Sequence, residues 1–225
     1  MESPFQNVIS SDHTHLFLDA SSVTVQAGLW HNGQWLAYRA AEAPALESIF
    51  VLVRDCLDDA GLGMEDVKGF LHCEGPGSVL GIRLAAMAIR AWRALPDWHE
   101  APVFACRSLP LVAALIRHTR EPEADFHLIA ESRQTRWNHL ASTAPETVEE
   151  VEPEALEALT PPVYHLRQRK AWHEPPEGAI AITSDLRTCP ELISQPGLFI
   201  PTDAPDLYQV NAPSFKTWTP ERHRA

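Results

Sequence analysis

The chain has 225 residues, of which 45% are hydrophobic and 21% are charged, so a packed core is expected and a disordered chain is excluded. Its formal net charge is −12, which disfavours a large nucleic-acid-binding surface because nucleic acids are polyanions. The four cysteines form no CxxC pair, so the sequence predicts buried, reduced thiols and neither a metal site nor a disulfide framework.

The N-terminus and the most apolar segment indicate where the protein resides. The first fifteen residues contain no Lys or Arg, which argues against a secretory signal. The most apolar predicted helix, at residues 79–95, is interrupted by arginines and is therefore not expected to cross a membrane. We expect a cytoplasmic protein.

The first hundred residues have a clear order of elements. Asn32-Gly33 is a typical hairpin turn, and apolar residues at helical spacing predict a helix over 45–60 that Gly61 ends. Four segments are expected to be β-strands: residues 16–20, 23–30, 34–40 and 67–73. Three strands, a helix, a strand and a further helix are the opening of a ribonuclease-H-like lobe.

The second half is predicted to repeat this order in part. Strands are expected at residues 102–108, 126–132 and 136–142, with a helix at 109–118. Proline is abundant after residue 145, so long elements are not expected there, and the acidic run 146–159 is interpreted as a solvated helix or loop. The prediction is a lobe over 1–105 and a degenerate, proline-rich lobe over 106–225.

A glycine-rich turn lies between the fourth strand and the next helix. Such a turn can expose backbone N–H groups to an anion, so Gly75, Gly77 and Ser78 are candidates for nucleotide contact. Its spacing fits neither the dinucleotide fingerprint nor the P-loop, and Ser78 is well placed as a helix N-cap. We favour a structural role for the turn.

The same turn carries a family resemblance. The run "GPGSVLGIRL" at residues 75–84 is similar to the "GPGSFTGLRIG" signature of the TsaB (YeaZ) family, and "LFLDASS" at 16–22 resembles that family's first strand, "LALDTST". "AESRQTRW", starting at Ala130, is a looser counterpart of the family's "DARRGEVY" strand. Val79-Leu80 replaces the family's Phe-Thr, so the chain resembles a divergent member.

The resemblance implies an α/β, actin-like (ASKHA) fold of two ribonuclease-H-like lobes. It also implies a non-catalytic subunit that dimerises with a TsaD-type transferase, with a TsaE-type ATPase as a further component, to make threonylcarbamoyladenosine next to the tRNA anticodon. No cofactor of its own is expected, and ATP only at an interface with partners. Alternatives are an actin-like ATPase or sugar-kinase-like phosphotransferase, and a homodimeric pseudoenzyme outside the tRNA pathway.

Catalysis has few candidates. TsaD-type enzymes are expected to hold a metal with two helix histidines, but residues 40–60 contain no histidine. Asp19 ends the strand where actin-like ATPases place an acid near the nucleotide, yet a carboxylate that satisfies its own turn is the favoured interpretation. Ser78 lacks assignable His and Asp partners as a nucleophile, and His13 with His15 is not expected to bind metal.

The helix after the turn is expected to contact a partner, because it is apolar on two sides and only one can cover the sheet. Small side chains on the second side would let two helices approach closely. For Arg83, an ion pair at the lobe interface and a contact with a partner are equally supported. The residues expected at the interface are Gly81, Ile82, Arg83, Ala85, Ala88, Ile89 and Trp92, with Ile49 and Val53 from the preceding helix.

Overall fold

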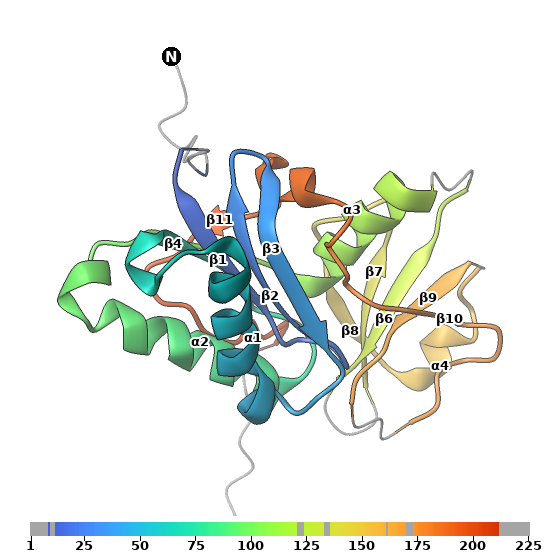
Figure 1. Cartoon of the computed structure of the whole chain (residues 1–225). Coiled ribbons are helices and arrows are strands. Elements are labelled where there is room, and N and C mark those ends of the chain that lie inside the picture. Colours follow the sequence, from blue (N-terminus) through green and yellow to red (C-terminus); the bar gives the residue numbers. More distant parts are fainter. Residues whose placement is uncertain are drawn as a thin grey trace, which may run out of the picture.

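The computed structural model describes residue 9 and residues 12–120, 124–132, 136–160, 162–169 and 173–211. It contains two β-sheets, each with its own helices (Figure 1).

The first sheet has six strands in the order β11-β5-β4-β1-β2-β3. β1, β2 and β3 form an antiparallel meander, β4 and β5 run parallel to β1, and β11 pairs antiparallel with β5. Positive φ angles at Asn32 (47°) and Gly33 (80°) form the predicted turn between β2 and β3. The bounds are β1 Thr14–Asp19, β2 Val25–His31, β3 Gln34–Ala41, β4 Val67–Cys73, β5 Val103–Cys106 and β11 Ile200–Pro201.

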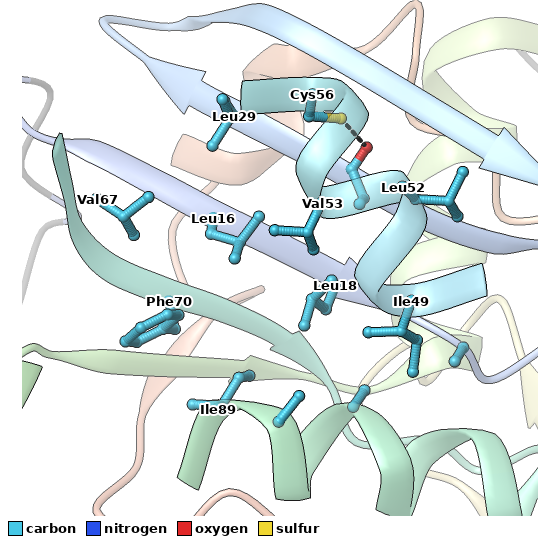
Figure 2. Close-up of a cluster of buried hydrophobic side chains, with 14 of the residues drawn as sticks. Leu16, Leu18, Leu29, Ile49, Leu52, Val53, Cys56, Val67, Phe70 and Ile89 are labelled. Atoms are coloured by element: carbon cyan, nitrogen blue, oxygen red, sulfur yellow. Dashed lines mark hydrogen bonds between the residues drawn. The ribbon is translucent and has the colours of Figure 1, made fainter. Parts of the chain in front are cut away.

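Two long helices, α1 (Ala45–Ala60) and α2 (Val79–Arg93), lie side by side on this sheet (Figure 1). Gly61 ends α1 in a left-handed conformation, as predicted. Figure 2 shows Leu16, Leu18 and Phe70 of the sheet meeting apolar side chains of both helices. Short 3₁₀ helices follow each one: η1 (Met64–Asp66) and η2 (Pro96–Trp98). No helix in the described residues is both long and apolar enough to span a bilayer.

The second sheet has five strands in the order β10-β9-β6-β7-β8. α3 (Ser108–Arg120) packs on one face, and the four-residue α4 (Pro153–Leu156) follows β8. The bounds are β6 His127–Glu131, β7 Trp137–Ala141, β8 Glu149–Val151, β9 Val163–Leu166 and β10 Ile180–Ile182. The acidic run at residues 146–159, predicted to be a helix or loop, contains the edge strand β8 as well as α4. Val148, which precedes β8, is buried.

The two sheets share one strand order. In each, three antiparallel strands are followed by two strands parallel to the first, which is the ribonuclease-H-like arrangement predicted for both lobes. Among the described residues, the connection from β9 to β10 contains no helix. The second lobe keeps the sheet and has lost helices, as expected for a degenerate copy.

The end of the chain returns to the first lobe. β11 joins the first sheet, and the 3₁₀ helix η3 (Pro190–Ser194) packs beside β3. The indole of Trp30 donates a hydrogen bond to the Pro190 carbonyl (3.0 Å), and that of Trp35 to the Leu186 carbonyl (2.9 Å). The predicted lobe boundary between residues 105 and 106 did not place this returning segment on the first lobe. The indole contacts join residues at least 150 positions apart, so no local pattern in the sequence indicates them.

Candidate functional site

Asp19, the acid expected near a nucleotide, is enclosed by the protein itself. It ends β1 and is 1% exposed. One carboxylate oxygen accepts the backbone N–H of Ser21 (2.8 Å), as the turn interpretation predicts. The other accepts Ser184 Oγ–H (2.8 Å) and Gln26 Nε2–H (3.2 Å). Three protein donors thus satisfy the carboxylate.

The network around Asp19 joins the two lobes. Gln26 Nε2 lies 3.0 Å from the hydroxyl of Ser184, which follows β10 in the second lobe. The Tyr38 hydroxyl donates a short hydrogen bond to Gln26 Oε1 and accepts the N–H of Leu186 (3.2 Å). Burial raises the pKa of Tyr38, so the phenol stays protonated. A fully hydrogen-bonded buried network of this kind fixes one lobe arrangement.

The glycine turn packs directly on the end of β1. A Cβ at Gly77 would lie 2.1 Å from the carbonyl oxygen of Ser21, and a Cβ at Gly81 would lie 2.2 Å from that of Ala20. Ser78 N–H donates to the same Ser21 carbonyl (2.8 Å). The turn therefore needs glycine because another segment of backbone touches it.

Several other groups of the turn are also hydrogen-bonded within the protein. Ser108, the first residue of α3, donates its N–H to the Gly75 carbonyl (2.8 Å) and its hydroxyl to the Pro76 carbonyl. Ser78 Oγ accepts the Gly81 N–H (3.4 Å), as predicted for an N-cap. These contacts favour the structural interpretation of the turn.

A C-terminal strap, residues 202–211, covers the outer side of the turn. The Asp206 carboxylate pairs with Arg90 of α2 (3.0 Å), and the Tyr208 N–H donates to the Glu74 carbonyl (2.8 Å). The Arg107 guanidinium lies 4.0 Å from the centre of the Tyr208 ring. The strap belongs to the proline-rich second half and contacts both lobes: Asp206 and Tyr208 contact the first lobe, whereas Asn211 donates a hydrogen bond to Glu150 of β8 (2.9 Å).

Most residues expected at a partner interface lie inside the protomer. More of the surface of α2 is buried than its two apolar stripes predicted, because the sheet, α1 and the strap surround the helix on three sides. Trp92 is half-buried and stacks on Phe70 (5.8 Å between ring centres), and Arg83 alone of the nine is exposed. Buried against the sheet or α1 are Gly81, Ile82, Ala85, Ala88, Ile89, Ile49 and Val53.

A different apolar surface on the same helices faces solvent. Leu46 (70% exposed) and Phe50 (58%) lie one turn apart on α1, and Leu80 (69%) and Met87 (61%) lie two turns apart on α2. The Phe50 ring contacts the half-buried Trp92 ring (6.0 Å between centres), which places this side of α1 against α2. We call these four residues the helix surface. Large apolar side chains exposed on two neighbouring helices are typical of a protein-binding site.

His15, the second histidine of the His13–His15 pair, is a core residue. His15 lies in β1, is 1% exposed and meets the rings of Trp30 and Phe104 edge-on. Its Nδ1 lies 3.0 Å from the carbonyl oxygen of His13. Burial lowers the pKa of His15 to about 4, which makes it a neutral core side chain.

Comparison with known structures shows which class of fold this is. The arrangement of two ribonuclease-H-like lobes is the actin-like α/β fold. Within that class the chain is similar to YeaZ from Pseudomonas aeruginosa, with a TM-score of 0.57 and 20% identity over 81% of this chain and 89% of that chain. It is equally similar in coverage and identity to an uncharacterized protein with similarity to peptidase YeaZ, also from Pseudomonas aeruginosa (TM-score 0.54).

Sequence comparison adds no closer relative: no protein-family profile and no curated protein sequence matches the chain. The agreement is therefore one of fold, at 20% sequence identity.

The sequence predicted the residues of the turn and Asp19, but not the distant residues Ser184 and Tyr38 that form hydrogen bonds in the Asp19 network. Ser184 and Tyr38 have no motif around them, and they reach Asp19 only through the tertiary fold. In sequence, Leu80 and Met87 cannot be told from core residues, because the identity of an apolar residue does not show whether another element covers its side chain. No pattern within α2 distinguishes these two residues from the buried ones.

Proposed function

We propose that this chain is a divergent TsaB-type protein: a non-catalytic, cytoplasmic subunit that dimerises with a TsaD-type transferase in the synthesis of threonylcarbamoyladenosine in tRNA. Two observations support this together. The signature at residues 75–84 occupies the turn that sets the direction of α2, and 81% of the chain is similar in fold to YeaZ. Neither the motif nor the fold is enough alone, since actin-like folds serve many activities.

The helix surface is the observation that carries the partner proposal. Its four apolar side chains are more than half exposed, whereas the small residues first expected there are in the core. Arg83 is also exposed and lies between Leu80 and Met87 along α2, so it can pair with an acid of the partner at the rim. A partner helix laid across α1 and α2 would bury these side chains at the centre of an interface.

A non-catalytic role is supported by the state of the candidate site. Asp19 is fully hydrogen-bonded to protein donors, and Gly77 and Gly81 touch the backbone that a phosphate would have to displace. The helix that would carry a TsaD-type histidine pair contains none. We therefore propose that the subunit has no cofactor of its own and that ATP binds, if at all, at an interface with partners.

The other partner assignments follow from the same surface and from charge. The isolated chain could form a homodimer through the helix surface, and a TsaE-type ATPase could be a further component of the complex. Direct tRNA binding is expected to be weak at a net charge of −12. The basic cluster at residues 165–173 is the exception in sequence, and its residues 170–172 lie outside the described residues.

The function is tested in cells from which this gene is deleted. Mass spectrometry of digested tRNA should show loss of threonylcarbamoyladenosine, and the tagged wild-type chain should restore it and co-purify with the transferase. Normal modification in the deletion strain contradicts the proposal. So does ATP turnover by the purified chain that Asp19→Asn abolishes, because that result would favour the phosphotransferase alternative.

A further inference from the structure

Three side chains with different metal-binding chemistry meet where α3 approaches η3, well away from the turn and the helix surface. His118 lies in the last turn of α3, Cys189 directly precedes η3, and Glu191 is the second residue of η3. The imidazole nitrogen, the thiol sulfur and a carboxylate oxygen all lie within 4.8 Å of one another. His118 Nε2 and Glu191 Oε1 are 2.5 Å apart.

The three groups form a recess with a buried base and an open rim. Cys189 is 1% exposed, whereas the side chains of His118 and Glu191 are 46% and 50% exposed. A cavity of about 290 Å³ adjoins the recess, because its lining includes Thr119 and Thr188, the chain neighbours of two of these residues. Thr188 Oγ1 lies 3.6 Å from Cys189 Sγ. Because the side chains of His118 and Glu191 are about half exposed, a cation bound by the three groups could also take a water ligand from solvent.

An ordinary ion pair accounts for only part of this arrangement. His99 and Glu100 form such a pair at 2.8 Å on the surface, with both side chains mostly exposed. The pair of His118 and Glu191 differs because a thiol lies beneath it. Among the residues that the structure describes, no other three His, Cys, Asp or Glu side chains converge in this way.

We propose that His118, Cys189 and Glu191 bind a zinc ion. Nitrogen, sulfur and carboxylate oxygen together are ligands that Zn²⁺ accepts, whereas Mg²⁺ and Ca²⁺ select oxygen ligands. Three protein ligands leave one tetrahedral position toward solvent, which water can fill. The spacing of these residues in sequence indicates no metal motif, because the fold brings His118 to a segment about 70 residues further along the chain.

A zinc ion at this position would connect the two lobes. α3 packs on the second sheet, and the segment around η3 accepts hydrogen bonds from Trp30 and Trp35 of the first sheet. The ion would hold the returning chain against α3. It would stabilise the folded state because the three ligands come together only in that state.

The purified full-length chain, stripped with a chelator, is titrated with Zn²⁺ in competition with a chromophoric chelator and separately with Co²⁺. We expect one saturable site, a thiolate-to-cobalt charge-transfer band and a rise in Tm with Zn²⁺. His118→Gln and Glu191→Gln should each weaken Zn²⁺ binding at least about tenfold. Cys189→Val should remove the charge-transfer band.

His99→Gln is the matched control, because it removes a surface histidine from a His–Glu pair without a cysteine, and it should change nothing. No saturable binding by the wild-type chain overturns the proposal, as does a charge-transfer band that survives Cys189→Val. If Cys189→Val does not fold, His118→Gln decides, because its side chain lies partly in solvent: unchanged Zn²⁺ affinity in this variant contradicts the site.

Discussion

The two lobes have the same strand order and differ in what covers their sheets. The first carries α1 and α2, with 16 and 15 residues, whereas the second has the shorter α3 and a four-residue α4. A sheet needs other elements to bury its faces, and the second lobe is also joined to the first through the Asp19 network and the returning chain. The two longest helices, α1 and α2, therefore belong to the lobe for which a partner surface is proposed.

The largest effect expected is from acid, because the first sheet buries two neutral histidines. Burial lowers the pKa of His15 and of His72, each to about 4. In the unfolded chain an ordinary histidine has a pKa near 6.5, so the unfolded state binds more protons between these values. Stability is therefore complete above about pH 6.5 and is lost as the pH falls toward 4, on the order of 3 kcal/mol for each histidine.

Denaturant unfolding of the wild type and of His72→Gln at several pH values measures this effect. His72 Nε2 lies 3.4 Å from the carbonyl oxygen of Asp206 in the strap. Its replacement should reduce the slope of unfolding free energy against pH. An identical slope in the variant would show that His72 does not contribute.

The next largest effect concerns the glycine turn. Gly81→Ala places a Cβ against the Ala20 carbonyl, so we expect a loss of roughly 3 kcal/mol in unfolding free energy. At an exposed helical position the same change would stabilise by about 1 kcal/mol. Gly33→Ala is the control, since its Cβ would meet open space and only its positive φ is unfavourable. Thermal or urea unfolding of both variants measures this, and a Gly81→Ala variant as stable as wild type would refute the close contact.

A smaller effect is expected at the junction of the lobes. Ser184→Ala removes one donor from the buried Asp19 carboxylate and should cost about 2 kcal/mol. Thr183→Ala, at the half-buried neighbouring residue, serves as the control. Equal unfolding free energies for the two variants would mean that the network does not hold the lobes together.

Local signals in the sequence were enough to predict most of the first lobe. Asn32-Gly33, Gly61 and Ser78 each act through their own backbone or the next turn of helix, so their roles can be read without knowing the fold. The helical spacing of apolar residues placed α1 and α2 for the same reason.

What remained hidden depends on distant contacts. Ser184 reaches Asp19 across 165 residues, and β11 is a two-residue strand that exists only because β5 has a free edge. The exposure of α2 could not be predicted either. Whether Ala85 or Leu80 faces solvent depends on α1 and on the strap, and neither contact leaves a pattern within α2 itself.

The most direct test of the account measures the affinity of the chain for a TsaD-type transferase after a change on the helix surface. Leu80→Glu should leave the unfolding free energy within about 0.5 kcal/mol of wild type, because the side chain is in water. It should weaken the complex at least about thirtyfold, because a charge would replace an apolar contact at the centre of the interface. Ile180→Glu, at an exposed apolar position on the second lobe, should change neither quantity. A folded Leu80→Glu variant that binds the transferase with wild-type affinity would contradict the account.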